Sequence, residues 1–346
     1  MKELSMKIAV IFGGASAERD VSIASGTQVL KALKMKGHEV LAIDSANGIV
    51  TGKELDNLLN QEKLKIQKTP PDQKTLPRLK KQTARALTSI PELHAVDLAF
   101  LTLHGGEGED GTIQAFFDVL NIPYTGSSHK GSALAMDKDL SKHLFRAAGV
   151  PTADWVLLKS HEITQTELEA SFDYPLIVKA NKQGSSVGLY VAKSWEEVQH
   201  AITNTLQFDD EVLIESYIPG KEYTVGILKN EALAVGEIIP QNSDLFDYES
   251  KYQADGAQEV FPAALSNELT KEAQRLALLA HQSLKLRDFS RVDFRLDEEG
   301  NFWCLEVNTL PGMTTRSLLP QSASSTGIPF PDFCERICQV AIERNQ

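Results

Sequence analysis

Carboxylate, amide and guanidinium side chains alternate with apolar residues in two short segments near the C-terminus. Arg291 and Asp293 lie in the first segment, and Glu306 lies with Asn308 in the second. Alternate side chains of a β-strand share a face, so each pair would share a face if both segments are strands. Carboxylate and amide oxygens suit Mg²⁺, and a guanidinium can stabilise charge that develops on a transferring group. A salt-bridged sheet face without catalytic function explains this pattern, taken alone, equally well.

The residues between these segments predict that they form a hairpin. Asp297-Glu-Glu-Gly300 is a typical turn sequence. A register that pairs the two residues flanking this turn would put Arg291 opposite Glu306, and a one-residue slip would break that arrangement. The Pro-Gly dipeptide that ends at Gly312 would expose backbone N–H groups beside the carboxylates, which favours a functional site.

A second candidate site is the loop Gly184-Ser-Ser-Val-Gly188, which follows a predicted strand containing Lys179. Small residues let backbone N–H groups approach a phosphate closely, and the lysine supplies a positive charge. The loop does not match the P-loop pattern, because no Gly-Lys-Ser/Thr sequence is present. Taken alone, such a loop is more often a simple turn.

Two further loops follow predicted strands of the N-terminal region. The first contains Glu18, and the second begins at His104 and is rich in glycine. Loops at the carboxyl ends of parallel strands commonly bind ligands, and Glu18 could bind a substrate ammonium there. The alternatives are an acid favoured by a helix N-terminus and a histidine that faces solvent from a tight turn.

The elements that position these residues indicate an α/β and α+β chain of three domains. Length favours two or three domains. A strand, a Gly-Gly loop, a helix and a second strand open the chain, which predicts an open parallel sheet. We expect domains at residues 1–126, 127–218 and 219–346. No chemistry is assigned to residues 45–92.

Composition excludes several classes of protein. The chain has 346 residues and a net charge of −12, from 35 basic and 47 acidic residues. This balance argues against nucleic acid or an anionic membrane as a partner. The three cysteines form neither a disulfide framework nor a zinc motif. The N-terminal apolar run reads as a strand and not as a signal peptide, and no run is long enough to span a membrane, so a cytoplasmic protein is expected.

Taken together and in order, these motifs resemble the ATP-grasp superfamily, and within it the D-alanine–D-alanine ligases. The resemblance runs nearly end to end, except for roughly residues 45–92. The matching segments lie at 13–22, 103–111, 123–126, 136–138, 177–188, 247–252, 291–293 and 306–314. It implies an ATP-grasp fold in which an N-terminal parallel-sheet domain precedes two ATP-grasp subdomains.

The resemblance also implies a role for individual residues. Those expected to bind nucleotide are Lys138, Lys179 and Lys251 at the phosphates, Glu215, Ser216, Tyr217 and Ile218 at adenine, and Glu222 at the ribose. The expected ligands of two Mg²⁺ ions, which Mn²⁺ may replace, are Asp293, Glu306 and Asn308. The expected substrate and oxyanion residues are Glu18 with Ser185 and Tyr252, Arg291 with Gly312, Ser317 with Leu318, and His104.

The reaction implied by the resemblance joins two D-alanines through an acylphosphate, to supply a peptidoglycan precursor. The alternative is a D-alanine–D-lactate or D-alanine–D-serine ligase, against which Tyr252 argues. Loops 243–256 and 183–188 are expected to close together over the intermediate and exclude water. ATP and D-alanine are the expected small-molecule partners, and the family resemblance suggests a homodimer.

Overall fold

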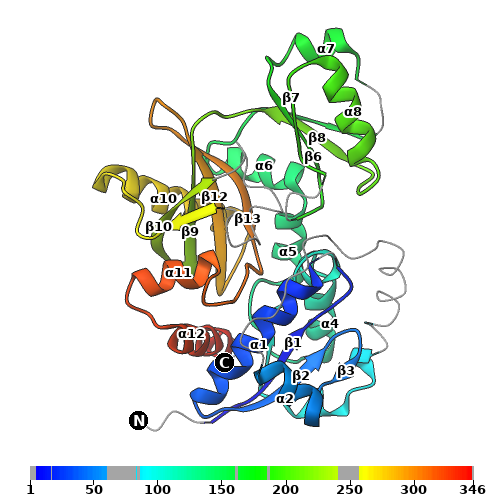
Figure 1. The fold of residues 1–346 in the computed structure, drawn as a ribbon, viewed down its shortest axis with the longest axis vertical. Coiled ribbons are helices and arrows are strands. Elements are labelled where there is room, and N and C mark those ends of the chain that lie inside the picture. Colours follow the sequence, from blue (N-terminus) through cyan, green and yellow to red (C-terminus); the bar gives the residue numbers. More distant parts are fainter. Residues whose placement is uncertain are drawn as a thin grey trace.

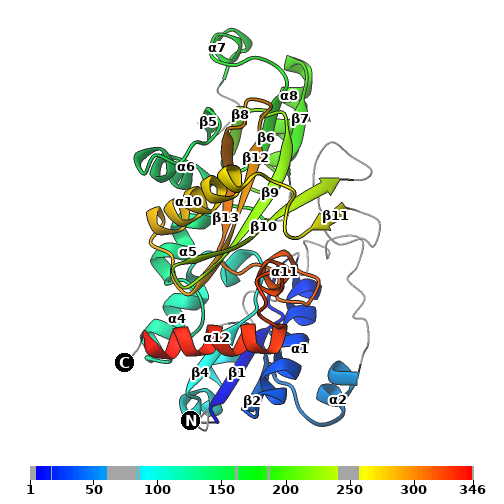
Figure 2. The same cartoon turned by 90° about the vertical axis from the view of Figure 1, so that its left-hand side faces the viewer.

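Within the part of the chain that the structure describes, three β-sheets follow one another along the long axis of the computed structural model (Figure 1). The N-terminal sheet lies at one end, a four-stranded sheet lies at the other, and a five-stranded sheet lies between them (Figures 1 and 2). The structure describes residues 5–16, 18–60, 83, 86–159, 163–184, 188–240 and 257–344.

The N-terminal sheet has the parallel core that the sequence predicts. Its strands, in the spatial order β3-β2-β1-β4, are β3 (Gly48–Ile49), β2 (Glu39–Asp44), β1 (Lys7–Phe12) and β4 (Leu98–Leu101). β1 pairs in parallel with both β2 and β4, while short β3 adds an antiparallel edge. The helical segments of this unit are α1 (Arg19–Met35), α2 (Gly52–Asn60), η1 (Pro91–Ala95), η2 (Gly106–Gly108) and α4 (Thr112–Leu120). The loops after β1 and β4 therefore emerge at the same edge of the sheet.

The four-stranded sheet is antiparallel and has the order β5-β8-β6-β7. Its strands are β5 (Trp155–Leu158), β8 (Val212–Ser216), β6 (Leu176–Ala180) and β7 (Tyr190–Ala192). The helices of this region are α5 (His129–Met136), α6 (Lys138–Ala147), α7 (Gln165–Glu169) and α8 (Trp195–Thr205). Asp137 caps α6, because its side chain accepts a hydrogen bond from the backbone N–H of Leu140.

The five-stranded sheet is also antiparallel and has the order β11-β10-β9-β12-β13. Its strands are β11 (Ala257–Val260), β10 (Glu231–Pro240), β9 (Lys221–Leu228), β12 (Phe289–Leu296) and β13 (Phe302–Asn308). The helices after β11 are α10 (Asn267–Ser283), α11 (Leu318–Ser325) and α12 (Phe330–Glu343). Phe145 of α6 shares a buried cluster with Leu276 and Phe294, so α6 also packs on this unit.

The hairpin β12–β13 forms, but the predicted register is wrong. Arg291 lies opposite Asn308, and Asp293 lies opposite Glu306, instead of Arg291 opposite Glu306. The turn pairs Leu296 with Phe302, and the register shifts again between Asp293 and the next residue. This β-bulge adds one residue to β13, so the acidic and amide side chains still meet across the two strands.

The last helix of the chain packs on the N-terminal unit. α12 lies against α1 (Figure 2), and its buried Phe333, Cys334 and Cys338 belong to the same apolar cluster as β1 and β4. His38 and Glu335 form a buried pair at 2.8 Å across this contact. Residues of the predicted third domain thus complete the core beneath the first, while the predicted domain boundaries stay a prediction.

Candidate active site

Asp293 lies at the centre of a polar cluster on β12 and β13. Its carboxylate accepts hydrogen bonds from Thr224 Oγ1 at 2.7 Å, from Arg291 Nε and Nη2 at 2.9 and 2.7 Å, and from Asn308 Nδ2 at 3.0 Å. Glu306 is its partner across the ladder. The structure thus brings together all three predicted metal ligands. Two carboxylates and an amide are a donor set that fits Mg²⁺, which takes a few protein oxygens and leaves other positions to phosphate and water.

Lys138, the first residue of α6, joins this cluster from another unit. Its Nζ lies 3.7 Å from Glu306 Oε2 and donates to the carbonyl oxygen of Gln183 at 2.6 Å. Gln183 directly precedes the Gly/Ser loop. A phosphate group between the lysine and the carboxylates would therefore have both a cation and potential metal ligands within reach.

Lys179 points from β6 toward Glu215 on β8, and their charged atoms are 2.5 Å apart. The other carboxylate oxygen of Glu215 accepts a 2.7 Å hydrogen bond from Lys142, a residue that the sequence analysis did not single out. Burial alone would raise the pKa of Glu215, but the two lysines outweigh it and hold that pKa at about 2. Lys142 was missed because a lysine in an amphipathic helix pattern normally faces solvent.

The other predicted nucleotide residues lie around the end of β8. Ser216 is its last residue, Tyr217 and Ile218 connect it to β9, and Glu222 lies in β9 beside Arg295 in the ladder. The Arg295 guanidinium lies 5.5 Å from the centre of the Tyr217 ring. This connection between two sheets is a reasonable position for an adenine ring, and the assigned contacts stay predictions.

The two N-terminal loops meet each other and the Gly/Ser loop. Glu18 is buried, and a methyl group placed on Gly105 would lie 2.7 Å from Glu18 Oε2. A methyl group on Gly184 would lie 3.3 Å from the same oxygen. Gly105 has a φ of +66°, so a larger residue there would have a strained backbone, and its side chain would clash with the Glu18 carboxylate. Glu18 is thus positioned next to the residue that begins the Gly/Ser loop.

His104 connects these loops to the segment that follows β13. Its Nε2 lies 3.2 Å from Ser25 Oγ, which accepts a 3.0 Å hydrogen bond from the backbone N–H of Met313. Burial lowers the pKa of His104, with Glu18 opposing that shift. His104 is therefore a neutral, buried ring held in place, and the solvent-facing alternative is excluded.

Glu109 is a second residue that the sequence analysis left without a role. Its Oε2 accepts a 2.7 Å hydrogen bond from the backbone N–H of Gly105. Burial and the nearby carboxylate of Glu18 raise the pKa of Glu109 to about 8. The signal available in the sequence was its position in the glycine-rich loop that begins at His104.

The predicted oxyanion and acceptor residues lie next to one another. A methyl group placed on Gly312, in the segment that follows β13, would approach Ser317 Oγ to 2.7 Å. Ser317 Oγ also accepts from the backbone N–H of Thr314 at 3.1 Å and lies at the N-terminus of α11, whose first residue is Leu318. Helix N-termini favour anions, so this position suits a substrate carboxylate.

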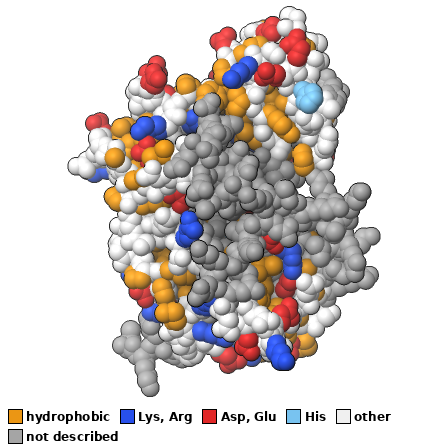
Figure 3. Space-filling model, in the orientation of Figure 1, with side chains coloured by type: hydrophobic (Ala, Val, Ile, Leu, Met, Phe, Trp, Pro, Cys, Tyr) orange, Lys and Arg blue, Asp and Glu red, His pale blue; other side chains and the backbone are white. Residues whose placement is uncertain are grey.

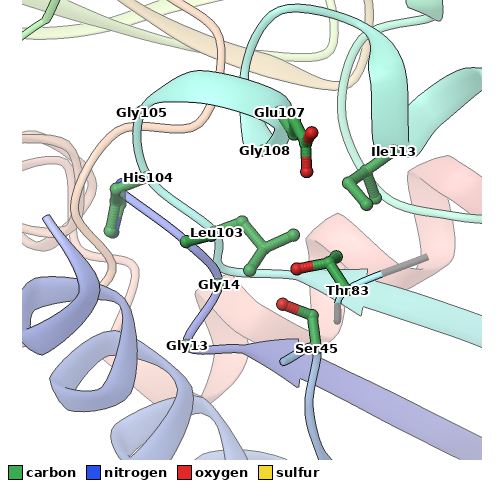
Figure 4. A pocket seen from close by; sticks show the side chains of 11 residues that line it. Gly13, Gly14, Ser45, Thr83, Leu103, His104, Gly105, Glu107, Gly108 and Ile113 are labelled. Carbon is green, nitrogen blue, oxygen red and sulfur yellow. The ribbon is translucent and has the colours of Figure 1, made fainter. Parts of the chain in front are cut away.

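A pocket lies beside these loops on the N-terminal unit (Figure 4). The hydroxyls of Ser45 and Thr83 lie side by side in this pocket, between Leu103 and Ile113 (Figure 4). His104 and Gly105 also line it, and Gly105 lies against the carboxylate of Glu18. The pocket therefore borders the predicted first-substrate site.

Three predicted site residues lie outside the residues that the structure describes. They are Ser185, Lys251 and Tyr252. The predicted closing loop 243–256 lies there with two of them. Their assigned roles stay predictions.

Comparison with known proteins decides the family. The family model described as "D-ala D-ala ligase N-terminus" matches residues 7–127, and "D-ala D-ala ligase C-terminus" matches residues 144–339. The chain belongs to the D-alanine–D-alanine ligase family. The predicted ATP-grasp fold and the ligase class are therefore confirmed.

Curated relatives in this family match over nearly their full length. A D-alanine–D-alanine ligase of Halalkalibacterium halodurans is 39% identical over 344 residues, which cover 98% of this chain and 100% of the relative. One of Geobacter sulfurreducens is 39% identical over 332 residues, covering 96% and 92%.

Solved structures of ligases share the fold. The D-alanine–D-alanine ligase of Bacillus anthracis in complex with ATP is 30% identical, with a TM-score of 0.75 and 98% coverage of both chains. The VanG D-Ala:D-Ser ligase of Enterococcus faecalis is 28% identical, with a TM-score of 0.80 and coverage of 98% and 100%.

Proposed function

We propose that this chain uses ATP to join two D-alanines into D-alanyl-D-alanine for peptidoglycan precursor synthesis. The observation that carries the proposal is the approach of Lys138 to Glu306, beside Asp293 and Asn308. A phosphate-binding cation and a magnesium-type donor set from different units meet there. The likeness to D-alanine–D-alanine ligases and to a D-Ala:D-Ser ligase supports a carboxylate–amine ligase.

In the first step the carboxylate oxygen of one D-alanine attacks the γ-phosphorus of ATP, and ADP leaves. Glu18, which is buried beside Gly105, would hold the ammonium of this substrate. Lys138 and Lys179 would bind the phosphates and neutralise part of their charge. His104, whose ring is neutral, is expected to lie near the second substrate and would add no charge there.

In the second step the amine of the other D-alanine attacks the acyl carbon. Inorganic phosphate leaves, and the amine loses a proton, which gives the peptide bond. Arg291 and the backbone N–H of Gly312 would stabilise the oxyanion, and the N-terminus of α11 at Ser317 and Leu318 would bind the carboxylate of the second substrate. Arg291 is held in position by its two hydrogen bonds to Asp293.

Asp293, Glu306 and Asn308 would hold two Mg²⁺ ions, for which Mn²⁺ can substitute. Bound there, the ions would neutralise the polyphosphate and the charge that moves during transfer. The hydrogen bonds from Thr224 and Arg291 fix the Asp293 carboxylate in advance, so that little conformational freedom is lost on binding.

The remaining parts of the proposal concern partners and environment. Acidic and basic side chains are interspersed over the face in Figure 3, among the residues that the structure describes. Within those residues, no helix is long and apolar enough to cross a membrane. We propose a cytoplasmic homodimer that binds neither nucleic acid nor membrane and closes loops 183–188 and 243–256 over its substrates.

The second candidate function is a D-alanine–D-serine or D-alanine–D-lactate ligase, which the likeness to VanG supports. Phosphate release should be measured with ATP, Mg²⁺ and D-alanine alone, and then with D-serine or D-lactate added. We expect full turnover with D-alanine alone and D-alanyl-D-alanine as the product. A mixed product that dominates at equal concentrations would favour the second candidate, and no turnover with any acceptor would refute both.

A further inference from the structure

Lys142 is a buried cation that the proposed mechanism does not use. It lies on α6 one turn after Lys138, and its side chain is 1% exposed. Its Nζ donates to Glu215 Oε2 at 2.7 Å and to Thr152 Oγ1 at 2.8 Å. Thr152 in turn donates to the carbonyl oxygen of Cys304 at 2.8 Å, on the strand that carries Glu306. A buried lysine keeps its charge only when that charge is compensated: burial lowers the pKa of Lys142, and the Glu215 carboxylate opposes that shift.

Glu215 receives a different lysine on each carboxylate oxygen. Lys142 is bonded to Oε2 and Lys179 to Oε1, and all three side chains are buried. With both lysines protonated, the cluster has two positive charges and one negative charge. One lysine is therefore enough to neutralise the carboxylate, and the second is available to another anion.

The two lysines differ in what else they can reach. Lys142 is held from a second side by Thr152, and its Nζ lies 5.1 Å from the centre of the Trp155 ring. Lys179 lies at the end of β6, just before the segment that leads into the Gly/Ser loop. A phosphate would thus draw Lys179 away from Glu215, whereas Lys142 would remain bonded to Glu215.

We propose that Lys142 is a positioning residue for ATP, which keeps Glu215 charged and in place when the nucleotide's phosphates draw Lys179 away. This inference rests on the proposed function, because it requires that Lys179 binds phosphate. Without Lys142, recruitment of Lys179 would leave Glu215 as a buried carboxylate without a cation. Such a group takes up a proton instead, or opposes binding.

Among the described residues, the titratable groups around Glu215 come from three elements. Lys142 faces it from α6, Lys179 from β6, and Cys304 of β13 lies close enough to both lysines to interact with their charge. Burial raises the pKa of the Cys304 thiol far above neutral pH, so this group stays uncharged and cannot replace a lysine. Glu215 therefore depends on the two lysines for compensation.

The test is calorimetric titration of the full-length protein with ATP and Mg²⁺, in buffers of different ionisation enthalpy at pH 7. The variant Lys142→Met removes the charge and keeps the length of the side chain. We expect ATP to bind it about tenfold or more weakly than wild type, because a buried charge loses its partner. We also expect uptake of up to one additional proton, so that the affinity deficit shrinks as pH falls.

The matched control is Arg146→Met. Arg146 is on the same helix and lies 4.4 Å from the centre of the same Trp155 ring, but its ion pair is with Asp154 and not with Glu215. We expect this variant to keep the wild-type affinity and proton count. The KM for D-alanine should be unchanged in both variants, within about twofold, because neither side chain belongs to the predicted amino-acid sites.

A double variant separates this role from a merely structural one. Lys142→Met with Glu215→Gln removes both charges, so it should abolish the extra proton uptake and regain stability relative to Lys142→Met alone. The ATP affinity of this double variant does not bear on the inference, because Glu215 is also expected at adenine. A single variant that matches wild type in affinity and proton count would overturn the inference, as would extra proton uptake that persists in the double variant. Absence of ATP binding by the wild type would instead refute the proposed function.

Discussion

Asp293 shows how neighbouring side chains prepare a single carboxylate for its role. Three different residues donate hydrogen bonds to it, from β9, β12 and β13. Those bonds fix the orientation of the carboxylate. Glu306 completes the set from the opposite strand and brings in Lys138. Asp293 is thus the carboxylate that its neighbours hold in place, and Glu306 is the carboxylate that approaches the phosphate-binding lysine.

Replacing Glu306 with Gln should lower turnover by about 100-fold or more, because a neutral ligand weakens a magnesium site beside phosphate. The fold should persist, since the amide keeps the size of the side chain. Steady-state phosphate release and circular dichroism would check both points. Glu298→Gln, in the exposed hairpin turn, is the matched control and should behave as wild type. Near-normal turnover of the Glu306 variant would refute the metal assignment.

Glu109 predicts a pH dependence of stability. Its pKa is about 8 in the folded protein against a reference value of 4.5, so the folded state holds a proton that the unfolded chain releases between these values. The contribution of this group to stability is thus complete below pH 4.5 and is lost as pH rises to about 8. Glu109→Gln cannot ionise and can still accept the hydrogen bond from Gly105.

We therefore expect Glu109→Gln to be similar to wild type in stability near pH 5 and more stable near pH 8, by on the order of 1 kcal/mol or more. Urea denaturation without ATP or Mg²⁺ at the two pH values would measure this. If Glu109→Gln were more stable than wild type by the same amount at both pH values, ionisation of Glu109 would not be the cause of that difference.

At the scale of elements, the sequence predicted which strands pair but not how they are aligned. Alternation of polar and apolar residues predicted the β12–β13 hairpin and the side chains that share its face. The bulge opposite Asp293 interrupts the alternation of buried residues in β13, where Cys304 and Val307 are buried three positions apart. It was missed because the prediction assumed unbroken alternation through both strands. The lysine on Glu215's second oxygen was missed for a similar reason, since helical spacing alone does not give burial.

Contact between β11 and α11 provides a prediction at this scale. The side-chain amide of Gln321 donates both to the Glu259 carboxylate and, at 2.7 Å, to the carbonyl oxygen of Arg316. It thereby joins the strand to the start of α11, where Ser317 is expected to bind the second substrate. Gln321→Leu should raise the KM for the second D-alanine by about tenfold, as expected when a hydrogen bond to a charged group is lost.

The reaction rate should be measured as a function of D-alanine concentration. At high D-alanine concentration the weaker of the two amino-acid sites determines how the rate rises, so this part of the curve gives the KM for that site. Gln282→Leu, at an exposed position of α10, is a suitable control. The KM for ATP should change in neither variant. If Gln321→Leu changes the ATP and D-alanine values equally, the contact supports the fold in general and not the acceptor site.

At the scale of the whole molecule, the parallel N-terminal sheet was predictable, and the packing of the last helix was not. The repeated β-α-β pattern indicated a parallel sheet at the N-terminus, which the structure contains. The amphipathic pattern of α12 showed that one face would be buried, but not that it would pack on α1. A hydrophobic face carries no information about which partner covers it.

Phe333→Ala tests the contribution of this packing. The side chain is completely buried in the N-terminal cluster, so its loss should cost about 3–5 kcal/mol in the free energy of unfolding. Urea denaturation followed by circular dichroism would measure the change. Val119→Ala, at a position 85% exposed on α4, should change stability by less than about 0.5 kcal/mol. Equal effects of the two substitutions would contradict the observed packing of α12.

The position of α12 has a consequence for synthesis of the chain. During translation the N-terminal residues leave the ribosome first, and domains commonly begin to fold as they emerge. Here the part of α1 and β4 that α12 contacts is covered only when residues 330–343 have been made. The growing polypeptide must therefore carry that part uncovered through most of its elongation, and a chain that stops short of α12 would be a natural target for chaperones and proteases.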